Sequence, residues 1–454
     1  MARRKKRSAL LALAALVLAL TGVVTTLERP INPSDLPSGL AVLMNAESTA
    51  LYCTGLTSGS GSPGRVVFYN TAGSSRSLSV NVVSASGQVY AKTVELAART
   101  SQFLVPSQDV KGSNFAVAVQ ISGGGVVAEE VSGTGRADVP CSSQGVTSWY
   151  GGGFDTLVGS SAWLSVYNPT ATAAVFNTSL FSAAGLTQPQ SLQGYSVPAH
   201  SVTEISLARS VVNTSNVGVA VTVSRGSLVI VGVQDSRGTI SFDQGARAAA
   251  TESWFSDVTT AASALAQIRV TNPNDVPTSV TVSLTLGHYA IPAQTINVNA
   301  YSTGLVSVTP NPAIPAAGYA AVTVASREPV VSTLATGVAP TIELISYEAP
   351  ATAFLIRNFT GRGFDAASVT NTTSGTITVS VTSLTDGAPH SSTVVGDVKV
   401  AARGTLDLAS VVPSLRRATN ETYIVASSRE DMVVSLTLPS HPAGVDVMAP
   451  LDGR

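Results

Sequence analysis

Short stretches in which apolar and polar residues alternate one by one recur along most of the chain. Residues 80–83 (VNVV), 280–284 (VTVSL) and 379–382 (VSVT) are typical of them. A period of two places every second side chain on one face of a strand, whereas a helix would need a period of 3.6, which the longer spans lack. The pattern therefore predicts an all-β protein whose strands each have one buried face.

These stretches recur in four copies. Ser122, Ser224, Ser326 and Ser428 each follow a similar run of alternating residues, and each number exceeds the one before it by 102. A fixed period of this length indicates a tandem repeat. Any chemistry must then belong to one copy or to the array as a whole.

Three further landmarks recur in a constant order in each copy. An aromatic residue comes first, at Tyr52, Trp149, Trp254 and Phe354. An asparagine that ends an apolar stretch follows, at Asn70, Asn168, Asn272 and Asn371. A pair that begins with alanine comes third, at Ala98-Arg99, Ala199-His200, Ala300-Tyr301 and Ala402-Arg403. Because Thr or Pro follows each asparagine, we expect a turn there, and we expect the two tryptophans to fill cores.

The repeat length favours one β-sandwich per copy. About seven short strands fit into about 100 residues, as in an immunoglobulin-like sandwich, although the Cys…Trp…Cys pattern of antibody domains is absent. The predicted copies span residues 49–143, 144–247, 248–346 and 347–454, after a linker over residues 28–48. The alternative is a β-propeller, whose blades of roughly 40–50 residues would require two unlike blades in each repeat.

The N-terminus predicts export. Residues 1–8 form a basic segment with Arg or Lys at positions 3–7, and an apolar run follows over residues 9–27. A run of nearly 20 apolar residues can cross a bilayer as a helix, and the basic cluster keeps its N-terminal side in the cytoplasm. We therefore expect a single-pass membrane anchor that contacts the lipid bilayer and leaves the bulk of the chain outside. The alternative is a cleaved signal peptide and a secreted protein.

The two cysteines agree with export. Cys53 lies near the start of the first copy and Cys141 near its end. An even number of cysteines in an exported chain favours a disulfide, which here would join the two ends of one sandwich. The alternative is a pair of unrelated buried thiols.

Charge and motifs exclude several function classes. Lys and Arg number 26, of which five lie in residues 3–7, so 21 remain against 27 Asp and Glu in the exported part. This net charge of about −6 argues against nucleic acid as a partner. The chain holds four histidines and no catalytic, phosphate-binding or metal-binding motif, so we expect no enzyme, no cofactor and no metal site. Glu129 and Glu130 are adjacent and would point to opposite faces of a strand, and we expect them in a solvated hairpin.

One repeated polar feature is a candidate binding site. Arg225, Arg327 and Arg429 each follow the periodic serine, where the first copy has Gly123. A row of arginines can bind an anionic polymer through phosphate or carboxylate groups. The alternative is that each arginine keeps the tip of a hairpin soluble.

A basic N-terminus, one membrane anchor and repeated Ser/Thr/Val/Ala-rich units with the turns Asn168-Pro169 and Asn272-Pro273 resemble a family of actinobacterial envelope proteins, domain of unknown function 5719. The resemblance implies an envelope location and provides no catalytic residues. We therefore expect a membrane-tethered extracytoplasmic structural or interaction protein that binds a partner protein or a wall polymer. The alternative is an accessory subunit or enzyme of envelope polysaccharide assembly, with a site formed between copies. The sequence does not determine the oligomeric state.

Overall fold

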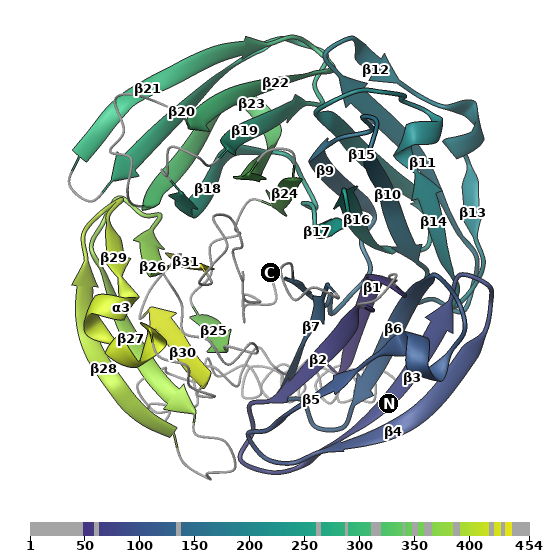
Figure 1. Ribbon diagram of the computed structural model, residues 1–454, viewed down its shortest axis with the longest axis horizontal. Coiled ribbons are helices and arrows are strands. Elements are labelled where there is room, and N and C mark those ends of the chain that lie inside the picture. The colour runs from purple at the N-terminus through teal and green to yellow at the C-terminus, as the bar shows by residue number, and fades with distance from the viewer. Residues whose placement is uncertain are drawn as a thin grey trace, which may run out of the picture. The chain divides into compact units, whose positions relative to one another are not determined.

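The computed structural model is all-β, as predicted, and its strands fall into four groups along the chain (Figure 1). It describes residues 49–58, 63–132, 138–259, 265–286, 289–309, 319–338, 341–346, 353–357, 366–384, 391–416, 422–427 and 432–437. All of them belong to one unit, Val42–Arg454. Residues 1–48, which include the predicted basic segment, anchor and linker, lie outside the described residues. Within the described ranges no helix is long and apolar enough to cross a membrane.

Two four-stranded antiparallel sheets make up the first copy. The strands are β1 (Ala50–Thr57), β2 (Arg65–Asn70), β3 (Arg76–Ser84), β4 (Val89–Leu96), β5 (Ser101–Leu104), β6 (Asn114–Ile121), β7 (Val126–Val131) and β8 (Asp138–Pro140), with the short helix α2 (Pro106–Asp109) before β6. One sheet has the order β1-β6-β3-β4 and the other the order β5-β2-β7-β8. We call the sheet that holds the first strand of a copy its A sheet and the other its B sheet.

The second copy repeats this topology. Its strands are β9 (Ser148–Phe154), β10 (Ser160–Tyr167), β11 (Ala174–Ser182), β12 (Gly185–Thr187), β13 (Tyr195–Val197), β14 (Val202–Ser206), β15 (Val217–Arg225), β16 (Val229–Ser236) and β17 (Thr239–Asp243), with the 3-10 turns η2 (Gln190–Leu192) and η3 (Leu207–Arg209). The short strands β12 and β13 both pair with β11 and together replace the fourth strand. The B sheet has the order β14-β10-β16-β17.

The third and fourth copies follow the same plan. The third holds β18 (Ala250–Thr259), β19 (Leu265–Asn272), β20 (Thr278–Leu286), β21 (Tyr289–Val298), β22 (Ser302–Thr309), β23 (Tyr319–Val338) and β24 (Thr341–Ser346). The fourth holds β25 (Ala353–Arg357), β26 (Ala366–Asn371), β27 (Ile377–Leu384), β28 (Ser391–Val400), β29 (Thr405–Asp407), α3 (Leu408–Val411), η4 (Pro413–Arg416), β30 (Thr422–Ser427) and β31 (Met432–Thr437). The 20-residue strand β23 pairs with β18 and β20 in the A sheet and with β19 and β24 in the B sheet. It therefore replaces the sixth strand, the hairpin and the seventh strand.

The tandem sandwich repeat is confirmed, with two differences from the immunoglobulin-like expectation. Each of the first three copies has an eighth strand, β8, β17 or β24, at the edge of its B sheet. In an antibody-type sandwich the first strand pairs with the second and the seventh with the sixth. Here β1 pairs with β6 and β7 pairs with β2, so the first and seventh strands exchange sheets.

Each copy buries its own core between its two sheets. The four cores are separate clusters built mainly from Val, Leu, Ile and Phe, and the cluster of the second copy also includes Ala335 and Leu344 of the third. Phe115, Phe154, Phe176 and Phe255 are among the largest fully buried side chains. Complete burial of such a side chain contributes about 1.5–3 kcal/mol. The alternation in the sequence is thus the origin of the fold, because it supplies one apolar face to every central strand.

The ladder register corrects one landmark. In each copy, the residue of the third strand that lies eight positions after the asparagine pairs with a residue of the sixth strand. From the first copy to the fourth, that partner is Ile121, Val223, Ser326 and Ser427. Ser122 and Ser224 follow this position, whereas Ser326 occupies it. The uniform spacing of 102 residues is therefore off by one residue in the third copy.

Candidate functional site

A buried asparagine ties the same turn in every copy. In the second copy, Nδ2 of Asn168 donates to the carbonyl oxygens of Thr172, Val197 and Pro198 at 2.8, 3.1 and 3.0 Å. Its Oδ1 accepts from the backbone N–H of Thr170 at 2.9 Å. Equivalent sets of bonds surround the other three asparagines, at Asn70, Asn272 and Asn371. The asparagine thus joins the turn before the third strand to the end of the fourth, and this repeated landmark is structural.

The residue after the repeated alanine turns the chain from the A sheet to the B sheet. Its φ is 53° at Arg99, 49° at His200, 51° at Tyr301 and 56° at Arg403. The left-handed region accepts few residues other than glycine without strain, and a single residue there reverses the chain sharply. The shared property of these four positions is therefore a backbone conformation, which explains why their side chains differ.

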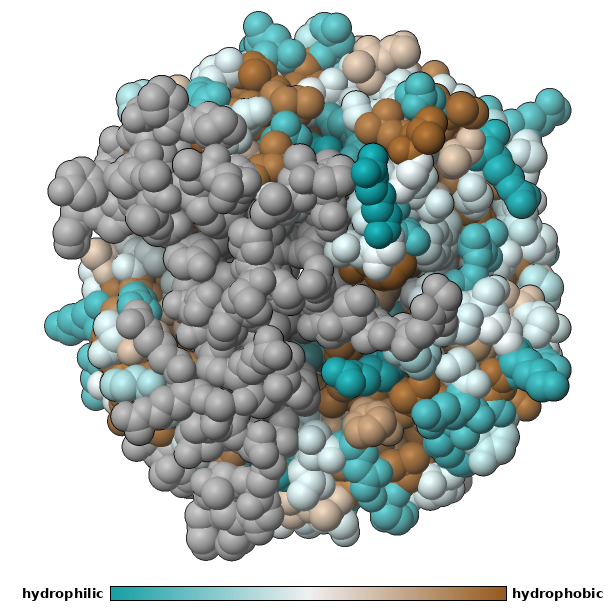
Figure 2. Space-filling view, viewed as in Figure 1, coloured by the Kyte–Doolittle hydropathy of each residue, from teal (hydrophilic) through white to brown (hydrophobic). Residues whose placement is uncertain are grey.

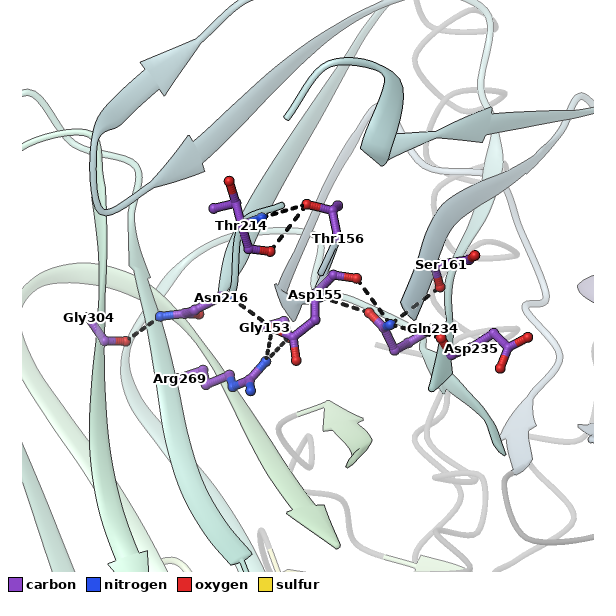
Figure 3. Close-up of polar contacts among 10 residues, drawn as sticks. All are labelled: Gly153, Asp155, Thr156, Ser161, Thr214, Asn216, Gln234, Asp235, Arg269 and Gly304. Carbon is purple, nitrogen blue, oxygen red and sulfur yellow. Dashed lines mark hydrogen bonds and ion pairs between the residues drawn. The ribbon is translucent and has the colours of Figure 1, made fainter. Parts of the chain in front are cut away.

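A buried ion pair lies between the second and third copies (Figure 3). Nη1 of Arg269, on β19, lies 2.9 Å from Oδ1 of Asp155, which follows β9, and it also donates to the carbonyl oxygen of Gly153. The two charged side chains are 5% and 4% exposed. Charges can lie this deep only when they are paired and hydrogen-bonded.

Neighbouring amides complete the cluster around Asp155 (Figure 3). Oδ1 of Asp155 also accepts from the backbone N–H of Asn216 at 3.0 Å, and Oε1 of Gln234 accepts from the backbone N–H of Asp155 at 2.8 Å. Nδ2 of Asn216 reaches across to the carbonyl oxygen of Gly304 at 2.8 Å. These bonds link Asp155 and Asn216 of the second copy to Arg269 and Gly304 of the third, so the cluster holds the two copies together.

Sequence reasoning missed this cluster, although one signal was present. Arg269 lies three residues before Asn272, at a position where the other copies have Val67, Ser165 and Ser368. A charge within an alternating strand, where the repeats have small or apolar residues, indicates a specific partner. Its partner Asp155 could not be inferred from one sequence, because the contact joins two copies.

A second buried carboxyl lies in the first copy. Glu130, on β7, is fully buried, and the backbone N–H of Thr54 at a bulge in β1 donates to its Oε1. The equivalent positions hold Gly232, Leu334 and Leu436. Burial raises the pKa of this carboxyl well above its ordinary value, and the Thr54 hydrogen bond opposes that shift. Glu129 is also buried, at 3% exposure, so the prediction of a solvated hairpin was wrong.

Other contacts between successive copies use different groups. Oγ1 of Thr54 and Oγ of Ser165 lie 2.8 Å apart between the first and second copies. Arg403 in the fourth copy lies 2.8 Å from the carboxylate of Glu252 in the third and 4.8 Å from the ring centroid of Trp254. Trp254 is 7% exposed but faces this contact, whereas Trp149 lies in the core of the second copy, as predicted.

Two of the three arginines in the predicted row, Arg225 and Arg327, lie among the described residues, and both are exposed. Arg225 ends β15 as an exposed residue whose Nε donates to the carbonyl oxygen of Ala173 at 3.2 Å. Arg327 is exposed on β23, and Arg429 lies outside the described residues. Hydrophilic residues on the face shown in Figure 2 form small scattered groups between apolar ones. The exposure of Arg225 and Arg327 agrees with both alternatives, a row that binds an anionic polymer and soluble hairpin tips, so the row stays a prediction.

The predicted disulfide is confirmed. Cys53 on β1 and Cys141, which follows β8, are bonded, with their Cα atoms 4.6 Å apart and a sequence separation of 88. A ladder bridge between Tyr52 and Ser142 lies beside the bond. The two ends of the first copy are thus joined covalently.

Histidine and carboxylate positions give no metal centre in the residues described. Of the four histidines, His200 holds the left-handed turn, and His288, His390 and His441 lie outside the described residues. No group of three or more His, Cys, Asp or Glu among the described residues could hold a metal ion.

The comparisons with family models and with curated proteins do not show a family for the chain. No family model and no curated protein match it. Among solved structures, a tetra-tandem repeat from the extending region of a large adhesion protein is 12% identical and covers 89% of this chain and 99% of its own, with a TM-score of 0.12. The Streptomyces avermitilis alpha-L-rhamnosidase is 9% identical and covers 86% of this chain and 55% of its own, with a TM-score of 0.13. Superpositions this poor carry no argument about function.

Proposed function

We propose that this chain is a non-catalytic extracytoplasmic protein of the bacterial cell envelope, which residues 9–27 tether to the membrane. In this proposal the four sandwiches form a scaffold that binds a partner protein or a wall polymer. The resemblance to the actinobacterial family of domain of unknown function 5719 supports the envelope location in this proposal.

The Cys53–Cys141 disulfide is the observation that carries the proposal. Disulfides persist outside the cytoplasm, and this bond uses both cysteines of the chain. Cys53 lies only 26 positions after Leu27, the end of the predicted anchor. If the first copy is exported, the chain must therefore leave the cytoplasm within residues 28–52, directly after the predicted anchor.

The repeated residues support a scaffold. The asparagine and the left-handed residue recur in all four copies, and both hold turns. The charged groups between the second and third copies, Arg269 and Asp155, form an ion pair with each other, which supports a structural role over a catalytic one. A site of polysaccharide assembly between copies would instead need unlike side chains that converge on an open cleft.

A topology experiment tests the proposal. Full-length protein is expressed in an actinobacterial host with a C-terminal alkaline phosphatase, which folds only after export. We expect an active, membrane-bound fusion whose β-domains are digested by protease added to spheroplasts. A control that lacks residues 1–27 should be cytoplasmic and inactive. An inactive full-length fusion would contradict export, whereas an active fusion in the culture medium would contradict only the tether.

A further inference from the structure

The fourth copy contacts the first, although they are most distant in the sequence. Tyr69 and Val127, on the B sheet of the first copy, form one apolar cluster with Leu384, Ile424 and Ala426, on the A sheet of the fourth. We call this cluster the 4–1 contact.

The large members of the 4–1 contact point away from the cores of their own copies. Phe68 precedes Tyr69 on β2 and lies in the first core, so Tyr69 faces the other side of its sheet. Tyr423 and Val425 flank Ile424 on β30 and lie in the fourth core. Tyr69 is nevertheless 1% exposed and Ile424 3% exposed. An outward side chain loses its exposure only when something beyond its own sandwich covers it.

The same positions join the first copy to the second. By ladder register, Tyr69 and Val127 correspond to Tyr167 and Val229 in the second copy. Leu384 and Ile424 of the fourth copy correspond to Val83 and Ala118 in the first. These four residues belong to one cluster between the first and second copies. The A sheet of one copy and the B sheet of another thus meet through matching positions in both contacts.

The contact between the second and third copies uses these faces as well. Gly218 and Thr271 are the equivalents of Ala116 and Tyr69. A Cβ added to Gly218 would collide with the side chain of Thr271, so the A sheet of the second copy meets the B sheet of the third here. A small residue on the A sheet accepts the side chain that projects from the B sheet.

We infer that the fourth copy docks on the first through the surface pair that joins the first to the second, so that the succession of A-to-B contacts returns to its starting copy. The occupant of the outer face of Tyr69 and Val127 is the fourth copy of the same molecule. When a series of head-to-tail contacts closes into a ring, no A or B face is left free. When the series stays open, the free faces can bind further molecules and form a filament. The 4–1 contact therefore also limits self-assembly.

Chemical crosslinking of the full-length protein tests the inference. Val127→Cys and Ala426→Cys place thiols at the partly buried margin of the 4–1 contact, and both native cysteines are already bonded. With a short bismaleimide we expect one intramolecular crosslink per chain and a band at the mass of a monomer. The matched control, Val89→Cys with Ala426→Cys, carries one thiol on the 63% exposed Val89 of β4 and should give no intramolecular crosslink. Dimers and higher ladders, or no crosslink in the first pair, would overturn the inference.

A second variant keeps the test decisive if the cysteines disturb packing. Ile424→Thr introduces the residue that the third copy has at the equivalent position, Thr323. In otherwise native protein, we expect amide hydrogen exchange in residues 65–70 and 126–131 to accelerate at least several-fold, with no change in β11 or β15. Equal exchange in the variant and the native protein would show that Ile424 does not cover the first copy.

Discussion

At the scale of single residues, the buried asparagine is the most constrained position of each copy. Removal of its side chain leaves buried carbonyl oxygens without donors, each at a cost of about 1–3 kcal/mol. We expect Asn168→Ala to lower the free energy of unfolding of the second copy by about 2–4 kcal/mol, measured by urea denaturation followed by tryptophan fluorescence. Asn177→Ala is the control, since Oδ1 of Asn177 accepts one exposed hydrogen bond from Gly194. A similar loss in both variants would refute the special role of Asn168.

At one left-handed residue, Tyr301, two substitutions should change the stability of the third copy in different directions. Tyr301 is 38% exposed with a φ of 51°. A β-branched residue is strained at this φ and glycine is not. We expect Tyr301→Val to destabilise the third copy by about 1–2 kcal/mol and so to lower its melting temperature. Tyr301→Gly should leave the melting temperature unchanged or slightly higher. Equal melting temperatures would show that the backbone at residue 301 relaxes.

Glu130 predicts a pH dependence of stability. Its pKa is raised by burial, so the folded state binds more protons than the unfolded state between the ordinary value of 4.5 and the raised value. The stabilising effect of the protonated carboxyl is complete below pH 4.5 and is lost as the pH rises through the raised pKa, at no more than about 1.4 kcal/mol per pH unit. Glu130→Gln keeps an oxygen for Thr54 and removes the titration. We expect this variant to gain stability over the native protein as the pH rises, while the exposed control Glu95→Gln follows the native curve.

At the scale of elements, the contacts between copies differ although the faces that make them are equivalent. The ion pair of Arg269 and Asp155 joins the second and third copies, and Arg403 with Glu252 joins the third and fourth. Loss of one member of a buried pair leaves the other charge buried without a partner, which costs about 3–5 kcal/mol of stability. An exposed pair contributes only about 0–1 kcal/mol.

A double-mutant cycle measures this difference. Arg269→Ser introduces the residue that the second and fourth copies have at this position, and Asp155→Ala removes its partner. We expect each single change to destabilise the second and third copies strongly, and the double variant to be clearly more stable than the sum of the two losses. The exposed pair Arg403 and Glu252 should show little coupling in the same cycle. Additive losses at Arg269 and Asp155 would mean that the pair does not couple the copies.

The sequence was sufficient for the elements within one copy and not for the contacts between copies. Alternation predicted the strands, and the positions of Cys53 and Cys141 predicted their bond, because these features depend on local pattern and on the order of strands within a single sandwich. The aromatic landmark was less reliable. Tyr52 pairs one register position away from the position equivalent to Trp149, so it faces Tyr167 of the second copy, whereas Trp149 faces the core. A shift of one residue reverses the face of a strand, and spacing alone does not reveal it.

At the scale of the whole molecule, the 4–1 contact predicts the behaviour of a truncated chain. A chain that ends at residue 346 lacks the fourth copy and uncovers Tyr69 and Val127. We expect it to self-associate in sedimentation experiments at concentrations at which the full-length chain does not. Tyr69→Thr, the residue of the third and fourth copies at this position, should reduce that association, and Phe103→Thr, at a residue that is 69% exposed, should not. A truncated chain that stays monomeric would contradict the prediction.

The disulfide also determines how the first copy responds to mechanical tension. A pull on the N-terminal side enters through β1, reaches Cys53 and crosses directly to Cys141, 88 residues further along the chain. The segment between the two cysteines is bypassed, and the roughly 300 Å that it would add on full extension is withheld. In the tethered scaffold that we propose, the other copies would then lengthen under tension before the first, which would add almost no length to the chain.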